Sequence, residues 1–187
     1  MVQIRFVVVL SCAILVSGVS SGAVWYVGGA GADDGNAGTQ DAPFATIQRG
    51  VDAAAKNDTV LIAAGTYLLD EAVEFKGKDV ELKGATGNAA DVIVDGQEKC
   101  PCIKNCTYDG KNPQVIVSSL TVQNGFSSEE SNIAGGITSQ NMALITNCVV
   151  RNCYHGVSGM KCTGGGIYLA EGKTDPTRYS SNWPAGR

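Results

Sequence analysis

The pattern of apolar and polar positions predicts one short helix near the start of the chain, followed by short strands. Apolar residues recur at helical spacing from Ile47 to Ala55, and Thr46 is a residue type that accepts a hydrogen bond from an unpaired amide at a helix start. We therefore expect a helix over about residues 45–56. Val60–Ala63 follows as four apolar residues without alternation, which predicts a strand buried on both faces and covered by the helix.

The remaining apolar segments are short strands separated by turns that contain glycine. They are Val24–Val27, Ala72–Phe75, Val80–Leu82, Val92–Val94, Val115–Val117 and Leu120–Val122. No further stretch of useful length has helical period, so we expect an all-β domain with a single helix.

Two short elements repeat along the second half of the chain. Leu120–Asn124 aligns with Cys148–Asn152, 28 residues on, and Gly135–Ile137 aligns with Gly165–Ile167, 30 residues on. Repeats of 20–50 residues are typical of solenoids, propellers and arrays. Each unit here holds short strands and no helix, which favours a β-solenoid.

Stacking the repeat places Cys148 on Leu120 in a dry interior and turns Arg151 outward. Asn124 and Asn152 then fall at strand ends, where a residue that tolerates the left-handed conformation is needed. We expect these two asparagines to form a ladder of turn residues on successive repeats.

Several segments together resemble a known family. Phe44–Gln48, Asp58–Tyr67 and Val92–Gly96, followed by the two repeats, resemble the right-handed parallel β-helix proteins of the pectin-lyase-like superfamily, and the repeats resemble those of polymorphic outer-membrane proteins. The resemblance covers nearly all of Val24–Leu169. It implies an all-β fold, a right-handed parallel β-helix (β-solenoid) over residues 24–169, with one N-terminal α-helix capping its first end.

The first 23 residues have the pattern of a signal peptide. Arg5 precedes the apolar run Phe6–Val16, and small residues follow at the expected cleavage positions. The run is too short to span a bilayer comfortably. We expect a secreted or cell-surface protein; lipid attachment at Cys12 is the alternative.

The net charge of the chain argues against some classes of binding partner. The net charge is −4 and there is no basic cluster, which argues against nucleic acid and anionic membranes as partners. No segment after the signal predicts a membrane span. Residues 170–187 form a polar tail without a second cap, and we expect the chain to be the N-terminal part of a longer protein.

Six cysteines lie beyond the signal peptide. They are Cys100, Cys102, Cys106, Cys148, Cys153 and Cys162. An even number in a secreted chain predicts disulfides or buried thiols. The alternative is a metal held by the first three, although their spacing differs from paired CxxC motifs and the chain has a single histidine.

A loop rich in glycine and acidic residues offers ligands for calcium. Asp33, Asp34, Asn36 and Asp41 carry the oxygen ligands that Ca²⁺ prefers. Their spacing does not complete an EF-hand, so the alternative is an ordinary solvated turn.

Three functions compete. The first is a non-catalytic surface protein whose extended face binds a polysaccharide, a cell-surface glycan or another surface protein, as long repeat surfaces do. The second, implied by the resemblance, is a Ca²⁺-dependent polysaccharide lyase, with Asp91, Asp95 and Arg151 as candidate catalytic residues. The third is a pectin-esterase-like hydrolase, which the chain resembles only around Gly65–Tyr67. We expect binding rather than catalysis, because no convincing catalytic set is present.

Overall fold

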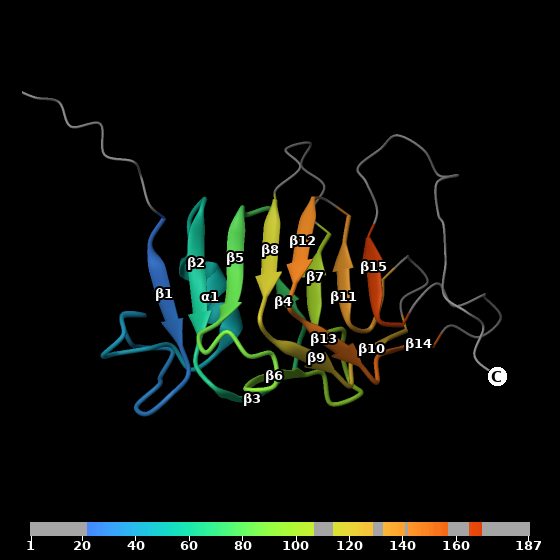
Figure 1. The fold of residues 1–187 in the computed structure, drawn as a ribbon, viewed down its shortest axis with the longest axis horizontal. Helices are drawn as coiled ribbons and strands as arrows, with labels where there is room; N and C mark the ends of the chain where they lie inside the picture. Colours follow the sequence, from blue (N-terminus) through green and yellow to red (C-terminus); the bar gives the residue numbers. More distant parts are fainter. Residues whose placement is uncertain (1–21, 107–113, 129–132, 141, 157–164, 170–187) are drawn as a thin grey trace, which may run out of the picture.

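The computed structural model describes residues 22–106, 114–128, 133–140, 142–156 and 165–169. Within these residues the chain is mostly β, with one short helix (Figure 1). The elements are β1 (Val24–Val27), α1 (Ile47–Ala53), β2 (Asp58–Ile62), β3 (Gly65–Leu68), β4 (Val73–Glu74), β5 (Val80–Gly84), β6 (Val92–Asp95), β7 (Ile103–Asn105), β8 (Val115–Ser118), β9 (Thr121–Gln123), β10 (Phe126–Ser127), β11 (Ile137–Ser139), β12 (Ala143–Thr146), β13 (Val149–Arg151), β14 (Tyr154–His155) and β15 (Ile167–Leu169).

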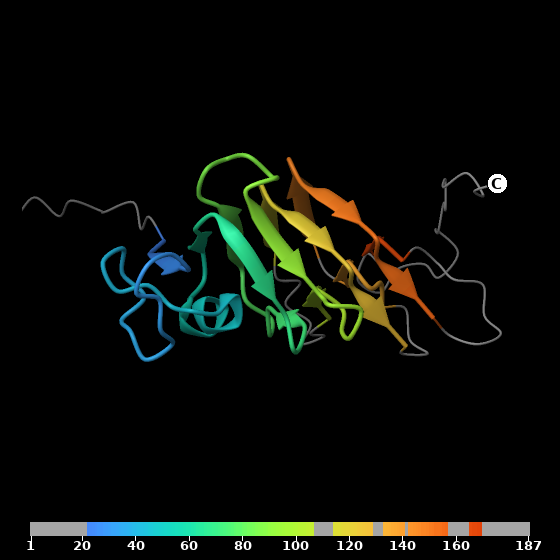
Figure 2. The same cartoon turned by 90° about the horizontal axis from the view of Figure 1, so that it is seen from below.

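The strands form parallel sheets that the chain visits in turn. The sheet orders are β1-β2-β5-β8-β12, β3-β6-β9-β13 and β4-β7-β11-β15, with a small fourth sheet of β10 and β14. Figure 1 shows the first sheet as a row of arrows whose colours run from blue to orange, and Figure 2 shows the strands following one another along the long axis. We call each passage through the sheets a round: β2 to β4, β5 to β7, β8 to β11 and β12 to β15. This order is consistent with a β-solenoid.

The repeats in the sequence are neighbouring strands in space. Val122 on β9 pairs with Val150 on β13, and Ile137 on β11 pairs with Ile167 on β15. The 28- and 30-residue offsets are therefore the lengths of chain between stacked strands. The register also turns Arg151 to the side of Gln123, away from the interior.

Helix α1 begins at the expected cap and ends early. Thr46 has an extended backbone, and its hydroxyl accepts a hydrogen bond from the backbone N–H of Arg49. Ala54 is extended as well, with ψ 143°, so the helix stops at Ala53 and is shorter than the 45–56 span predicted from spacing. Asn57 adopts the left-handed conformation in the turn before β2.

The helix packs closely onto the first two strands. A β-carbon on Gly50 would lie 2.8 Å from side-chain atoms of both Val27 and Val60, so glycine allows this close approach. Val60 and Ile62 are completely buried, whereas Leu61 between them is only half-buried. The prediction that this strand is buried on both faces was therefore wrong: one face packs inward and the other is partly open to solvent.

The apolar side chains become more exposed from the first round of the stack to the last. In the first sheet, Leu82 and Val117 occupy one interior column and are each 1% exposed, whereas Ile145, their partner on β12, is half-buried. On the same last round, Leu144 is 50% exposed and Val149 45%. The apolar interior is therefore best covered in the early rounds. These rounds lie at the end of the stack that carries α1 (Figure 2).

Candidate functional site

A groove runs along the early rounds on the side of the helix. It has a volume of about 1040 Å³ and is lined by the segment after β1, the start of α1, β3, the loop 69–72, β4 and residues before and within β7. We call it the α1–β3 groove. Its lining mixes apolar side chains, such as the 63% exposed Leu68, with the charged residues Asp70, Glu71, Lys76 and Lys104. Polar and apolar groups converge in it, which is the usual character of a ligand site.

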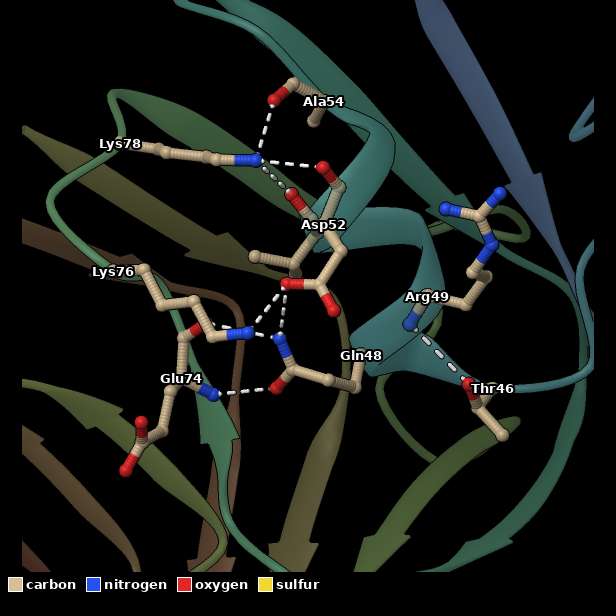
Figure 3. Close-up of polar contacts among 9 residues, drawn as sticks. Thr46, Gln48, Arg49, Asp52, Ala54, Glu74, Lys76 and Lys78 are labelled. Atoms are coloured by element: carbon tan, nitrogen blue, oxygen red, sulfur yellow. Dashed lines mark hydrogen bonds and ion pairs between the residues drawn. The ribbon is translucent and has the colours of Figure 1, made fainter. Parts of the chain in front are cut away.

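One wall of the groove is held by a side chain of α1, which hydrogen-bonds to the free backbone edge of β4. The amide oxygen of Gln48 accepts a 2.8 Å hydrogen bond from the backbone N–H of Glu74, and its Nε2 donates to the Glu74 carbonyl at 3.2 Å (Figure 3). Nε2 also lies 3.0 Å from Oδ1 of Asp52. Gln48 thus fixes β4 against α1, and with it the position of the groove wall.

Two lysines tie the same wall to the helix. Lys76 donates to Oδ1 of Asp52 at 2.8 Å, and Lys78 donates to the carbonyls of Val51, Asp52 and Ala54 (Figure 3). A cation at the last carbonyls of a helix satisfies acceptors that have no partner inside the helix. Burial disfavours the charge on Asp52, but the hydrogen bonds from Lys76 and Gln48 outweigh it and lower the pKa of this carboxyl.

The charges inside the groove divide into paired and unpaired groups. Lys104 forms an ion pair with Glu74 at 3.4 Å, and Lys76 is engaged by Asp52. Asp70 and Glu71 form no hydrogen bond or ion pair with the other described residues. The groups left to meet a ligand are therefore two carboxylates.

An aromatic residue lines the end of the groove nearest β1. Tyr67 is half-buried, and its hydroxyl donates to the carbonyl of Ala63 at 2.9 Å. Gly28 has φ +81°, and a β-carbon there would lie 1.8 Å from the Tyr67 oxygen, so the ring fits only beside glycine. Burial raises the pKa of Tyr67, which keeps the phenol neutral and presents a ring with one polar end.

A second set of polar residues forms a column on the neighbouring sheet. Asp95, Gln123 and Arg151 are paired positions on β6, β9 and β13. Nε2 of Gln123 donates to Oδ2 of Asp95 at 2.8 Å, and Arg151 donates to the Gln123 amide oxygen through Nε at 2.9 Å and Nη2 at 2.7 Å. The structure thus brings two of the three catalytic candidates into one chain of hydrogen bonds.

Asp95 is held as an ionised structural group. It is 8% exposed and also accepts from the Gln97 N–H and the Asn124 amide. Burial opposes ionisation, but the hydrogen bonds from Gln123, Gln97 and Asn124 prevail and lower the pKa of Asp95. A carboxylate with both oxygens engaged is poorly placed to bind a metal ion or to abstract a proton in this state.

Asp91 does not join this column. It lies at the other end of β6, and its Oδ1 accepts from the side chain of Asn88 at 3.1 Å within the preceding turn. The sequence prediction that Asp91 and Asp95 share one catalytic face stays a prediction, and the geometry gives each carboxylate a different neighbourhood.

The predicted calcium ligands mainly organise the loop before the helix. Asp34 accepts from the backbone N–H groups of Ala45 and Thr46 and from the Thr46 hydroxyl, and Asp33 accepts from the Gly35 N–H. Asn36 donates to the carbonyls of Gly31 and Pro43, whereas Asp41 is exposed. No group of three histidine, cysteine or acidic residues among the described positions is arranged to hold a metal ion. A calcium site in this loop stays a prediction.

Turn residues that the sequence singled out have left-handed backbones. The two predicted residues, Asn124 and Asn152, both have φ 52°. Asn147, which follows β12 and was not predicted, has φ 50°. The Asn124 amide donates to Asp95, and that of Asn147 donates to Gly87 and Ser119. The side chains of two of these turn asparagines therefore connect neighbouring rounds.

Four cysteines are free thiols in the structure. They are Cys100, Cys102, Cys148 and Cys153. Cys106 is half-buried, and Cys162 lies outside the described residues. None of the four carries a disulfide, so the disulfides predicted from the cysteine count stay a prediction.

No helix among the described residues is long and apolar enough to cross a membrane.

Several residues of the α1–β3 groove could not be predicted from the sequence. Gln48 falls between the apolar positions of the helix stripe, and nothing local indicates that it reaches a strand 26 residues away. Lys104 and Glu74 become neighbours only through the register of β4 and β7. Tyr67 was recognisable as part of a motif, but its position beside Gly28 depends on the pairing of distant strands.

Comparison with known proteins identifies a family without an assigned activity. Residues 29–175 match the family described as a protein of unknown function, DUF1565. No curated protein and no solved structure matches the chain. Because the matched segment covers more than half of the sequence, the chain belongs to the DUF1565 family.

Proposed function

We propose that this protein is a right-handed parallel β-helix that works at the cell surface or outside the cell and binds neutral glycans through the α1–β3 groove, without catalysis. Three parallel sheets visited in turn support the fold, as does membership of a family associated with β-helix proteins. The short helix packed on the first strands supports a capping role.

One observation carries the binding proposal: the two unpaired carboxylates, Asp70 and Glu71, lie in the same groove as Tyr67 and Leu68. Sugars present hydroxyl groups, which donate well to carboxylates, and C–H faces, which pack on exposed apolar and aromatic side chains. Hydrogen bonds to a charged acceptor are stronger than neutral ones. A mixed lining of this kind suits a hydroxyl-rich ligand.

The charges of the groove favour neutral over acidic glycans. Lys76 and Lys104 are engaged by carboxylates of the protein, which leaves no unpaired cation among the charged groove residues to meet a uronate. The net charge of the whole chain is also negative. Like charges across a binding site cost affinity, so an acidic polysaccharide should bind more weakly.

Affinity electrophoresis tests the proposal directly. The purified protein is run in native gels that contain a neutral β-glucan, xylan or mannan, or polygalacturonate. We expect retardation by at least one neutral polysaccharide and none by polygalacturonate. The double variant Asp70→Ala, Glu71→Ala should bind about 100-fold more weakly, since each lost hydrogen bond to a charged acceptor contributes about 1.5–3 kcal/mol.

The matched control is Asp41→Ala, which removes an exposed carboxylate outside the groove. It should bind like the wild type. Equal retardation of the double variant and the wild type, or salt-dependent binding to polygalacturonate alone, would show that the groove is not the site.

A Ca²⁺-dependent lyase is the alternative function, and the Asp95–Gln123–Arg151 column is what favours it. The guanidinium of Arg151 lies at the exposed end of that column. Against it, both oxygens of Asp95 are already engaged. Growth of ultraviolet absorbance from unsaturated uronate, dependent on Ca²⁺ and lost in Arg151→Ala, would establish the lyase.

A further inference from the structure

Two cysteines from different rounds approach one another inside the stack. Sγ of Cys102 lies 3.4 Å from the carbonyl of Gln123, and Sγ of Cys153 lies 3.2 Å from the carbonyl of Arg151. Gln123 and Arg151 are paired positions on β9 and β13, and neighbouring strands are spaced by about 4.8 Å. The two sulfurs thus lie beside adjacent strands, and the two side chains interact with one another.

A glycine makes room for this approach. A β-carbon on Gly125 would lie 2.9 Å from Sγ of Cys102, so a larger residue would displace the sulfur. The carbonyl of Gly125 accepts from the backbone N–H of Tyr154, which fixes the residue that follows Cys153. Gly125 therefore sets the positions of both cysteines, one through space and the other through the backbone.

The two thiols differ in access and in acidity. Cys102 is completely buried, whereas Cys153 is half-buried and packs against the edge of the core. The hydrogen bond from Cys102 lowers the pKa of Cys153 to about 7, and the same bond together with burial raises the pKa of Cys102. Cys148 is half-buried as well, but burial raises its pKa. Reactivity toward disulfides follows the thiolate fraction and access, so Cys153 has the properties of an attacking thiol.

We infer that Cys153 and Cys102 form a dithiol pair that oxidises to a disulfide joining two rounds of the stack, by exchange with a small external disulfide such as oxidised glutathione. The Cys153 thiolate attacks one sulfur of the external disulfide, forms a mixed disulfide and releases one glutathione thiolate. Cys102 then attacks the Cys153 sulfur, its proton passes to the departing sulfur, and the second glutathione leaves as a thiol. The two protein thiols are oxidised, and one external disulfide is reduced to two thiols.

The first experiment maps the reaction in the folded, full-length protein. The reduced protein is incubated with oxidised glutathione at pH 7.5, the remaining thiols are alkylated, and peptides are analysed by mass spectrometry without reduction. We expect a linked peptide pair containing Cys102 and Cys153, which dithiothreitol separates. A pair linked through other cysteines, glutathione that stays on Cys153, or no reaction would each overturn the inference.

Variants separate the roles of the two sulfurs. Cys102→Ser should accumulate the mixed disulfide on Cys153, because the thiol that resolves it is gone. Cys153→Ser should give neither the mixed disulfide nor the link, whereas the matched control Cys148→Ser should behave as the wild type. Circular dichroism melts confirm that each variant is folded before it is scored.

Alkylation kinetics provide a readout that does not depend on substitution. In the wild-type protein at pH 7, Cys153 should react with iodoacetamide about tenfold faster than Cys148, because about half of the Cys153 thiol is ionised at this pH. The lower nucleophilicity of a more acidic thiolate offsets part of this advantage in rate. Equal rates at the two cysteines would contradict an activated Cys153.

Discussion

Replacing Asp58 by alanine tests how much a single carboxylate stabilises this fold, because the change adds neither bulk nor a new charge. It is 6% exposed, and its carboxylate accepts from the backbone N–H of Ala23 at 2.7 Å, the indole N–H of Trp25 at 2.9 Å and the backbone N–H of Ala55 at 2.8 Å. These donors belong to β1, to the residue before it and to the turn after α1. One side chain at the start of β2 thus holds the helix and the first two strands together.

The magnitude follows from the three hydrogen bonds. A bond to a charged group contributes about 1.5–3 kcal/mol. The three donors share one carboxylate and are only partly buried, so the lower end applies and the loss in Asp58→Ala should be about 4 kcal/mol. At about 2–4 °C per kcal/mol for a chain of this size, the Tm should fall by about 8–16 °C. Asp41→Ala, at an exposed position, should stay within about 0.5 kcal/mol of the wild type.

The same carboxylate predicts a dependence on pH. Burial opposes its ionisation, but the bonds from Ala55, Trp25 and Ala23 prevail, so the folded pKa of Asp58 lies below that of the unfolded chain. The stabilisation is therefore fully present above the unfolded pKa of about 3.9 and is lost as pH falls through the lower folded pKa. The difference in Tm between wild type and Asp58→Ala, measured by circular dichroism, should be largest above about pH 4 and shrink below it. A difference under about 2 °C at pH 7, or one that does not change with pH, would refute the reasoning.

Three further substitutions test the packing of the early rounds. Gly84→Ala should cost about 1–3 kcal/mol in urea unfolding, because its β-carbon would lie 2.0 Å from the Ser119 carbonyl and the backbone must shift; an unchanged midpoint would contradict that close approach. Val60→Asp places an unpaired charge at a completely buried position, so the cooperative thermal transition should disappear. A melt like that of the wild type would show that Val60 is not part of the core. Thr46→Ala removes the helix cap and should cost about 1 kcal/mol, with Thr46→Ser restoring most of the loss; equal melts for both variants would argue against the cap.

The sequence was most informative where local pattern and tertiary structure agree. The first strand was predicted with its observed bounds, Val24–Val27, and the 28-residue repeat gave the pairing of β9 with β13. It was less informative at β3 (Gly65–Leu68), which is absent from the strands predicted from the sequence. In the structure Gly65 opens a strand and pairs with Val92, and only the parallel neighbour makes that visible.

The candidate sites could be predicted only in part, for a related reason. Asp95 and Arg151 share a column because the repeat period carries both to the same sheet, and both residues were named from the sequence. Gln123, which connects them, has no chemical signature of its own. The α1–β3 groove depends on Gln48 meeting Glu74 across 26 residues, a contact that arises from packing and leaves no local pattern.

The decline in burial along the stack should make unfolding directional. In a structure in which each round contacts only its neighbours, the stability of a round is the sum of its own contribution and those of the two interfaces it shares. Val117 has a fully packed column around it, whereas Ile145 one round later is half-buried. Amide hydrogens of β12 and β13 should therefore exchange through local opening, while those of β2 and β5 should exchange only when the whole stack unfolds. Among the described rounds, the one that contains β12 and β13 would then open first, and those next to the helix would persist longest.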